Sequence, residues 1–313
     1  MAGKVVCVAG PTGCGKTRLG VLLAQRFGGE VVSADSMQIY RGMEIGSAAP
    51  APEEQQGVPH HLLGVADPAE SWSVSRYVEA AVPVIDDILA RGKLPLLVGG
   101  TGLWMEAAVR GTVFPPGQAG GAVRKELEGQ LAAEGIEPLL AELSRVDPAS
   151  AARLHPSDTK RILRALEVWR ETGQPLSALN AEERRRPPRY EATWLGLTFR
   201  DRGELRRRIS ARADAMAEAG LLEEVRALAA SVPRNATAFQ AIGYKELLPV
   251  LDGQRSLAEG MAEVKLRTGQ FAKRQMSWFR RNPAIHWLVW EDVQDFPTAL
   301  QISTNILTGS GVC

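Results

Sequence analysis

The stretch Gly10-Pro11-Thr12-Gly13-Cys14-Gly15-Lys16-Thr17 matches the pattern G-x-x-x-x-G-K-[ST] at every fixed position. It follows an apolar run over residues 4–9 that is typical of a buried strand. It precedes residues 16–27, whose apolar side chains recur at helical spacing. Glycines let such a loop fold around phosphate groups with its amides pointing inward, and the next helix presents its positive N-terminal end. The motif requires this strand–loop–helix context, so the stretch predicts a phosphate-binding loop.

Two side chains of this loop carry chemistry. Lys16 supplies a positive point charge, and the Thr17 hydroxyl can bind Mg²⁺. The pattern predicts phosphate binding but not the reaction, because the same kind of loop holds ATP, GTP or another diphosphate.

Outward from the loop, strands and helices alternate. A second short apolar strand is expected over 30–34, a helix over 74–89 and a third strand over 94–98. A strand, a helix and a further strand in this order form a parallel sheet with a right-handed crossover. We therefore predict an α/β fold with a P-loop NTPase-like parallel sheet flanked by helices.

The middle of the chain changes character at a Pro- and Gly-rich stretch over 114–121. Helical periodicity then runs from 123 to 170, prolines at 187–188 mark a loop, and strand character returns at 193–199. We expect a helical insertion domain over 115–199 within a core formed by 1–114 and 200–313. Helices are expected over 202–229, with a break near Gly220, over 240–251 and over 257–281, before a last strand at 285–290.

Composition narrows the class of protein. Of 313 residues, 45% are hydrophobic and 23% charged, and no apolar run approaches the ~20 residues of a membrane helix. The start of the chain does not read as a signal peptide, so we expect a cytoplasmic protein. Three separated cysteines without a C-x-x-C pair argue against a disulfide framework or a zinc site.

Charge is segregated along the chain although the net charge is only +1. Residues 267–281 hold five basic side chains and no acidic one, and 184–189 form a second basic stretch. Such segregation favours a polyanionic partner. Trp278 and Phe279 within the first stretch are predicted to be core residues rather than platforms for bases.

Asp35 follows the second strand and so lies at the carboxyl edge of the sheet, near the phosphate loop. A carboxylate there can bind a metal through water, accept a proton from an attacking group, or cap a turn. Gln38, three residues later, carries an amide that matches the donor and acceptor of adenine.

A second Gly-rich turn, Gly99-Gly100-Thr101-Gly102, ends the strand over 94–98. Thr101 is expected to face the same pocket as Lys16, where its hydroxyl can donate to a diphosphate oxygen. Thr101 also suits the N-cap of the next helix, and the two roles are compatible.

Further stretches extend these motifs over almost the whole chain. They read S-A-D-S-M-Q-I-Y-R-G-M-E-I-G at 33–46, P-H-H-L at 59–62, G-G-T-G-L at 99–103, D-T-K-R-I-L-R-A-L-E-V at 158–168, A-I-G-Y-K-E at 241–246 and A-K-R-Q-M-S-W-F-R at 272–280. With the phosphate loop, they resemble the bacterial tRNA dimethylallyltransferase (tRNA isopentenyltransferase) family.

The resemblance implies a prenyltransferase. Such an enzyme moves the dimethylallyl group of dimethylallyl diphosphate to N6 of the adenosine 3′-adjacent to the anticodon in tRNA and releases pyrophosphate, assisted by Mg²⁺. The phosphate loop would hold the diphosphate donor in place of a nucleoside triphosphate.

The resemblance also implies roles for individual residues. Asp35 matches the catalytic aspartate that takes the N6 proton, Thr101 the threonine near the bridging oxygen of the donor, and Lys16 the lysine of the loop. Arg208 or Arg212, on the helix after the insertion, is a candidate second clamp for pyrophosphate. The tRNA-contacting positions are Asp35, Ser36, Met37, Gln38, Thr101, Arg124, Lys160, Arg161, Ile162, Leu163, Arg164, Lys273, Arg274, Gln275 and Arg280.

The sequence departs from the family pattern at four positions. Cys14 replaces alanine or serine, Trp104 replaces tyrosine, and Ser47 and Ala49 stand where threonine and lysine are usual. The Ala49 change removes a charge near the pocket. The cysteine count also argues against a C-terminal zinc finger of the kind that eukaryotic relatives carry.

Three other functions share part of this pattern. A small-molecule kinase would use the same loop and Asp35 but would not need the basic stretch at 267–281. A free-adenylate prenyltransferase would dispense with an RNA-binding surface, and an RNA-binding ATPase would not need both Asp35 and Thr101. The basic segments favour tRNA as the partner, and we expect a monomer because no self-complementary patch is visible.

Overall fold

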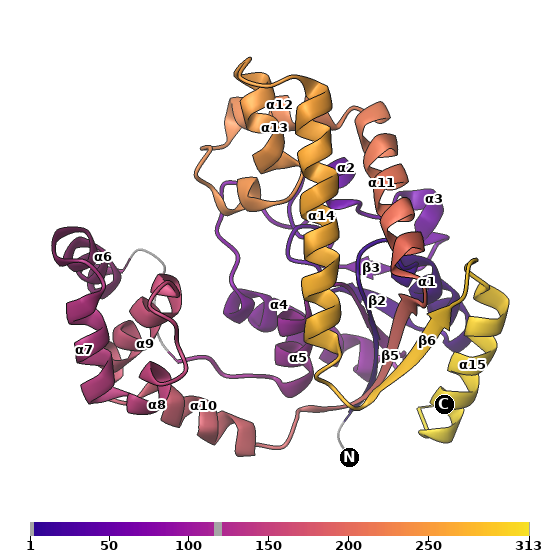
Figure 1. Cartoon of the computed structure of the whole chain (residues 1–313). Coiled ribbons are helices and arrows are strands. Elements are labelled where there is room, and N and C mark those ends of the chain that lie inside the picture. The colour runs from indigo at the N-terminus through magenta and orange to yellow at the C-terminus, as the bar shows by residue number, and fades with distance from the viewer. Residues whose placement is uncertain (1–2, 116–120, 313) are drawn as a thin grey trace. The chain divides into compact units, whose positions relative to one another are not determined.

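The computed structural model describes residues 3–115 and 121–312 (Figure 1). The expected hinge at 114–121 lies largely outside these residues, as does Cys313. The strands are β1 (Gly3–Ala9), β2 (Glu30–Ser33), β3 (His60–His61), β4 (Pro95–Val98), β5 (Tyr190–Phe199) and β6 (Ile285–Trp290). They form one sheet in the order β3-β2-β4-β1-β5-β6. Every neighbouring pair is parallel, which confirms the predicted fold class.

Helices cover both faces of the sheet. The side chains of β1 alternate, so that Val5 and Cys7 join one apolar cluster while Val6 and Val8 join another. The first cluster includes residues of α4 (Val74–Ala90), α5 (Gly102–Arg110) and α14 (Leu257–Phe279). The second includes α1 (Lys16–Phe27) and α15 (Phe296–Gly309). A sheet that is buried on both faces explains why its strands read as continuous apolar runs.

Other core helices lie beyond the carboxyl ends of the strands. They are α2 (Glu44–Ser47), α11 (Arg202–Glu218), α12 (Leu221–Ser231), the 3₁₀ turn η1 (Thr237–Gln240) and α13 (Tyr244–Leu251), while α3 (Pro52–Gln55) contacts α1. The expected break at Gly220 is present, because this residue has φ +97° between α11 and α12. The helix expected over 240–251 starts later, at Tyr244, since Gly243 has φ +100° and ends the preceding turn.

The insertion forms a unit of its own over 112–188. It contains α6 (Ala122–Glu134), α7 (Glu137–Val146), α8 (Pro148–Ala151), α9 (Thr159–Thr172) and α10 (Leu176–Arg185). Its apolar core includes Leu127, Leu143 and Leu166. Asp147 joins its helices, because its carboxylate accepts hydrogen bonds from the amides of Ser150 and Ser177, each at 3.0 Å.

The predicted end of the insertion at residue 199 is wrong. Strand β5 pairs with β1 along its length, from Gly3↔Tyr190 to Ala9↔Gly196, and so belongs to the core unit of 1–111 and 189–313. The chain returns to the core directly after the prolines at 187–188. The strand character at 193–199 is the second part of this longer core strand.

Candidate active site

A cavity of about 340 Å³ lies at the carboxyl ends of β1, β2 and β4. The phosphate loop contributes Thr12, Lys16 and Thr17 to its wall. The segment after β2 contributes residues 35–38, and Gly99 contributes from the turn after β4. The carboxyl ends of parallel strands meet at one edge of the sheet, so motifs distant in the sequence converge there.

The phosphate loop has the backbone that its glycines predict. Gly15 adopts φ +93° and Gly10 φ +143°, and a Cβ on Gly10 would lie 2.4 Å from the carbonyl oxygen of Leu197. Helix α1 begins after Gly15, which has no side chain to cap it, so the first amides of the helix remain available to a phosphate. Lys16 Nζ donates to the Pro11 carbonyl at 2.8 Å.

Cys14 lies behind the loop. Its side chain is fully buried, and burial raises the pKa of its thiol in spite of the nearby Lys16. The Cys14 carbonyl accepts a hydrogen bond of 2.8 Å from the indole of Trp290, which fixes the loop to β6. Cysteine in place of the usual small residue is therefore accommodated as a small apolar side chain, away from the cavity wall.

Asp35 lines the cavity and also shapes its own turn. Its Oδ1 accepts the Met37 amide at 3.0 Å, which is the turn-capping role considered from the sequence. One oxygen is used in this way, and the carboxylate retains acceptor capacity toward the cavity. The hydrogen bond from the Met37 amide orients the Asp35 carboxylate, which remains able to accept a proton.

Thr101 is bonded to the segment that carries Asp35. Its Oγ1 accepts the Ser36 amide at 3.1 Å and donates to Ser36 Oγ at 3.4 Å. Thr101 occupies the N-cap position of α5, but its hydroxyl bonds Ser36 rather than the first turn of the helix. Thr101 is not part of the described cavity wall, which Ser36 lines, so its expected direct exposure to the pocket is not seen.

Gln38 lines the cavity with both ends of its amide engaged. Its Oε1 accepts from Ser33 Oγ at 3.0 Å, and its Nε2 donates to the Ala48 carbonyl at 3.1 Å. An adenine edge would have to replace these contacts. They also join β2 to the chain around Ser47, one of the positions that depart from the family pattern.

The two candidate clamps on α11 differ. Arg212 lines the cavity, with contacts of 3.5 Å to Thr12 Oγ1 and 3.4 Å to the Ala48 carbonyl. Arg208 instead donates to Gln294 Oε1 at 2.7 Å and lies over the ring of Phe199. Of the two arginines, Arg212 is the one that lines the cavity.

The cavity combines a cationic part with an apolar part. Lys16, Arg212 and Arg274 are the Lys and Arg residues of its wall, and Asp35 is its acidic residue. Much of the remaining wall is apolar and consists of Met37, Leu63, Ala213, Met216, Leu221, Ile242, Val264 and Phe271. This combination suits a ligand with an anionic head and a hydrocarbon tail.

A carboxylate that the sequence did not single out holds the far side of the cavity. Glu224 on α12 accepts the amides of Ile45 at 2.8 Å and Gly46 at 2.9 Å, and the Tyr244 hydroxyl at 2.5 Å. A Cβ on Gly46 would lie 2.4 Å from the Tyr244 ring. These contacts join the M-E-I-G stretch at 43–46 to the I-G-Y-K-E stretch at 242–246. Glu224 itself could not be singled out from the sequence, because it is one of several charged residues on its helix.

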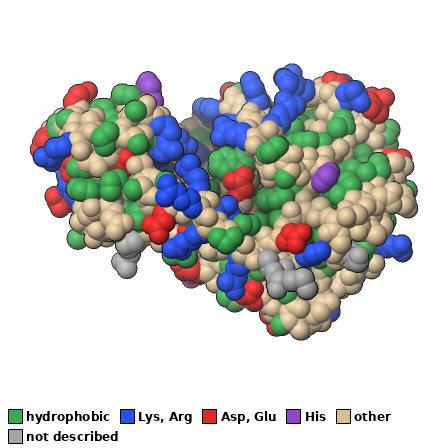
Figure 2. Space-filling view, turned by 90° about the horizontal axis from the view of Figure 1, so that it is seen from below, with side chains coloured by type: hydrophobic (Ala, Val, Ile, Leu, Met, Phe, Trp, Pro, Cys, Tyr) green, Lys and Arg blue, Asp and Glu red, His purple; other side chains and the backbone are tan. Residues whose placement is uncertain are grey.

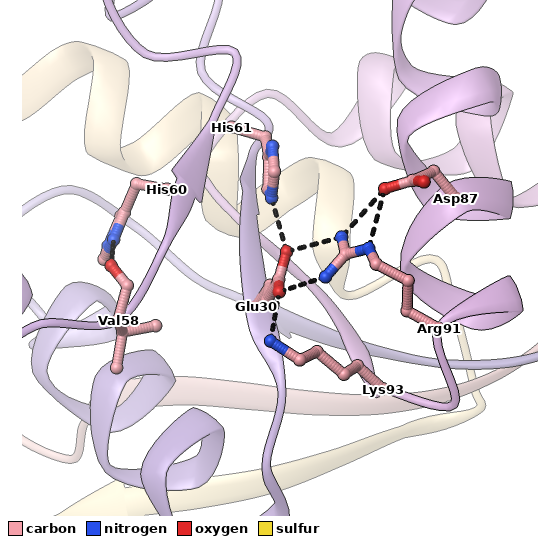
Figure 3. Close-up of polar contacts among 7 residues, drawn as sticks. All are labelled: Glu30, Val58, His60, His61, Asp87, Arg91 and Lys93. Atoms are coloured by element: carbon pink, nitrogen blue, oxygen red, sulfur yellow. Dashed lines mark hydrogen bonds and ion pairs between the residues drawn. The ribbon is translucent and has the colours of Figure 1, made fainter.

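A buried carboxylate stands at the start of β2 (Figure 3). Glu30 is 2% exposed and accepts from Arg91 Nη2 at 2.8 Å, Lys93 Nζ at 2.7 Å and His61 Nε2 at 2.7 Å. His60 points away from this group and contacts the Val58 carbonyl at 2.8 Å. Hydrogen bonds from Arg91, then Lys93 and His61, hold the pKa of Glu30 well below its usual range in spite of burial.

The residues expected to contact tRNA from the insertion divide into three groups. Lys160 and Arg161 are exposed. Ile162 is fully buried and Leu163 is 3% exposed in the core of the insertion, so a side-chain contact of either with tRNA is ruled out in this structure. Their periodicity is that of the apolar face of α9. Arg124 pairs with Glu128 at 2.8 Å, and Arg164 pairs with Glu167 at 3.0 Å.

The expected contacts on α14 also divide. Arg274 and Gln275 face the cavity, whereas Lys273 and Arg280 line a separate groove of about 630 Å³ between α11 and α14. Arg202 and Arg206 line the same groove, and no Asp or Glu is among its described residues. Lys and Arg side chains gather in clusters on the face seen in Figure 2.

Phe279 is 1% exposed and Trp278 packs on Gly102, which places both in the core as predicted.

The donor set fits Mg²⁺. Thr17 and Asp35 offer hydroxyl and carboxylate oxygens to one cavity, and hard oxygen ligands are those that Mg²⁺ prefers. The described residues contain no group of three His, Cys, Asp or Glu that could hold a metal alone. A small number of protein ligands is compatible with Mg²⁺, because this ion usually completes its coordination shell with water and substrate phosphates.

These features define a P-loop α/β protein with a site for an anionic, partly apolar ligand. Comparison with known families narrows the class. Residues 38–282 match the IPP transferase family model, and residues 3–64 match the isopentenyl transferase model.

Known relatives agree over nearly the full length. A tRNA dimethylallyltransferase of Geobacillus thermodenitrificans is 44% identical over 99% of this chain and 98% of its own. One of Symbiobacterium thermophilum is 47% identical over 91% of this chain and 88% of its own. The chain therefore belongs to the IPP transferase family.

Solved structures support the same assignment. The crystal structure of the tRNA isopentenylpyrophosphate transferase of Bacillus halodurans has a TM-score of 0.73 and 40% identity, covering 98% of this chain and 96% of that one. A eukaryotic dimethylallyltransferase acting on tRNA has a TM-score of 0.85 and 29% identity, covering 98% and 80%. Among the described residues, no helix has the length and apolar character needed to cross a bilayer.

Proposed function

We propose that the protein transfers the dimethylallyl group of dimethylallyl diphosphate to N6 of the adenosine 3′-adjacent to the anticodon in tRNA, releasing pyrophosphate. The observation that carries the proposal is one cavity that joins the phosphate loop, Asp35 and an apolar wall. The relatives named tRNA dimethylallyltransferase support the same reaction.

The reaction needs positioning more than strong chemistry. The N6 lone pair is delocalised into the adenine ring, so the amine attacks only when aligned with the allylic carbon. A bond forms between N6 and that carbon while the bond from carbon to the bridging oxygen breaks, and pyrophosphate leaves with the electron pair. Asp35 accepts the proton that N6 loses.

The negative charge that develops on the leaving group meets fixed positive groups. Lys16, the loop amides and Arg212 surround the phosphate end of the cavity, and preorganised charges of this kind stabilise a transition state. Lys16 must exchange its hydrogen bond to the Pro11 carbonyl for the phosphate. Mg²⁺ held by Thr17 would supply further charge neutralisation at the diphosphate.

The acceptor has to leave its base stack to reach the cavity. Extrusion costs a few kcal/mol in a duplex and less in a single-stranded loop. The exposed cations Lys160, Arg161, Lys273 and Arg280 suit the phosphates of such an RNA. Since tRNA is the acceptor, we infer a cytoplasmic protein. The monomer remains the prediction made from the sequence.

The decisive experiment incubates the purified protein with labelled dimethylallyl diphosphate, Mg²⁺ and unmodified tRNA, in parallel with AMP and with ATP. Label in tRNA that disappears in Asp35→Ala supports donor, acceptor and base together. Label in AMP would assign a free-adenylate prenyltransferase instead. ATP consumption without labelled tRNA would assign a kinase or an RNA-binding ATPase.

A further inference from the structure

Gln275 on α14 is hydrogen-bonded to two separate loops of the active site. It is 5% exposed. Its Oε1 accepts the Thr12 amide of the phosphate loop at 2.9 Å. Its Nε2 donates to the Gly100 carbonyl of the turn after β4 at 3.0 Å. One side-chain amide thus joins the loop after β1 to the turn after β4.

The second of these loops leads on to the acceptor segment. The Gly100 carbonyl belongs to the peptide unit that precedes Thr101, and Thr101 Oγ1 accepts the Ser36 amide. Asp35 immediately precedes Ser36. A continuous series of bonds therefore runs from the phosphate loop, through Gln275 and Thr101, to the residue that accepts the proton.

Close packing holds the Gln275 amide in place. A Cβ on Gly100 would lie 2.1 Å from Gln275 Nε2, so the amide touches the turn where only glycine leaves room. A buried side-chain amide whose oxygen and nitrogen are both hydrogen-bonded is costly to disrupt, because a polar group would be left unpaired in the interior. Its burial and its two backbone partners make it a poor candidate for contact with RNA, the role that the resemblance implies for it.

We propose that Gln275 is a positioning residue that sets the distance between the phosphate loop and the Thr101 turn, and hence between the donor and Asp35. The kinetic part of this inference rests on the proposed function. A misplacement of about 1 Å between reacting groups costs roughly 10²-fold in rate, so a small shift of either loop is measurable.

Three variants break the link in different ways. Gln275→Met keeps the length of the side chain and removes both hydrogen bonds. Gln275→Glu keeps an acceptor for the Thr12 amide but offers Gly100 an oxygen that cannot donate. Gly100→Ala displaces Nε2 and leaves Gln275 itself unchanged. Gln301→Met and Gly309→Ala, both on α15 and outside the cavity and the groove, are matched controls, because Gln301 is exposed and a Cβ on Gly309 meets no described residue within 4 Å.

Two readouts separate positioning from general damage. Calorimetric binding of inorganic pyrophosphate reports on the phosphate site without any contribution from RNA, and initial rates give kcat and the KM values for donor and tRNA. We expect pyrophosphate affinity to fall about tenfold and kcat to fall roughly 10–100-fold in the three variants, with the KM for tRNA within about twofold. The controls should match the wild type, and circular dichroism verifies folding. If Gln275→Met does not fold, the other two variants carry the test.

Two results would overturn the inference. Unchanged pyrophosphate affinity and kcat in folded variants would mean that the link is dispensable. A rise in the KM for tRNA alone would return Gln275 to RNA binding. Failure of the wild type to modify tRNA would refute the proposed function, while pyrophosphate binding would still test the link between the loops.

Discussion

Arg208 and Arg212 lie one turn apart on α11, yet Arg208 is bonded to Gln294 whereas Arg212 faces the cavity that holds the phosphate loop. A shift of four residues moves a side chain by only about 40° around a helix, so the sequence could not separate the two. The difference between the two arginines comes from Gln294, which is distant in the sequence and accepts a hydrogen bond from Arg208.

Replacing Arg212 should weaken binding of the diphosphate. We expect Arg212→Ala to raise the KM for dimethylallyl diphosphate roughly 10–100-fold, the range for removal of a hydrogen bond to a charged group. Arg208→Ala should change it by less than about threefold because its guanidinium bonds Gln294. Pyrophosphate calorimetry checks both variants, and a larger effect at Arg208 would contradict the assignment.

Replacing Asp35 should remove proton acceptance but keep the turn. An asparagine at this position still accepts the Met37 amide, so Asp35→Asn preserves the local hydrogen bond. We expect kcat to fall about 10²–10⁴-fold, as when a general base is removed, with pyrophosphate affinity unchanged. Single-turnover transfer of label measures this, and a kcat near that of the wild type would rule out Asp35 as the base.

Lys273 and Arg280 should determine part of the salt dependence of tRNA binding. Removal of one cation that binds a phosphate should reduce the slope of log Kd against log salt by about 0.7–0.9. Lys273→Ala and Arg280→Ala should each show this, whereas Arg26→Ala, at the end of α1, should not. Filter binding between roughly 50 and 200 mM salt gives the slopes. Equal slopes in all four proteins would remove the groove from the RNA surface.

Glu30 should make the free energy of unfolding depend on pH. Its pKa is depressed in the folded chain, so its contribution is complete above the unfolded value near ~4.3 and is lost as pH falls toward the folded value. We expect the free energy of unfolding to drop below about pH 5 in the wild type, and to drop less in Glu30→Gln.

The same variant should lose roughly 1–3 kcal/mol at pH 7, less than for a fully buried pair, because Arg91 and Lys93 are each more than a third exposed. Urea unfolding at several pH values measures both effects. Asp292→Asn, at an exposed position, serves as the control. Parallel pH profiles in wild type and Glu30→Gln would refute the prediction.

Gly46 should be sensitive to a single added methyl group. Gly46→Ala places a Cβ 2.4 Å from the Tyr244 ring and strains the contacts of Glu224, which should cost about 1–3 kcal/mol, as for overpacking. Gly309→Ala in α15 meets no described residue within 4 Å and should stabilise by up to about 1 kcal/mol. Thermal and urea unfolding compare the two variants. A neutral Gly46→Ala would show that Tyr244 moves freely.

The local elements were predictable because their signals are local. Glycines at 10, 13 and 15 and the apolar strands around them specify the phosphate loop without reference to the rest of the chain. The end of the insertion was misplaced because β5 is recognisable as a core strand only through its partner β1, which lies far away in the sequence, in pairs such as Lys4↔Glu191.

The site was predicted less completely than the fold. Asp35 and Lys16 line the cavity, as their places after strands predicted, whereas Thr101 bonds Ser36 and is not among the residues of the described wall. The partners of all three residues depend on tertiary packing. Gln275 follows Lys273 and Arg274, which are both exposed. Neighbours on a helix point about 100° apart, so a buried side chain can follow exposed ones, and the basic stretch did not reveal that Gln275 is buried. Glu224 had no sequence signal, since its partners are backbone amides 178 and 179 residues away.

The two ends of the insertion meet at one place in the core, where the Arg189 amide donates to the Arg110 carbonyl at 3.2 Å. Among the described residues, all six strands of the sheet lie outside 112–188, so the register of the sheet is set without the insertion. A change in the length of the insertion would therefore leave the pairing of every strand as it is.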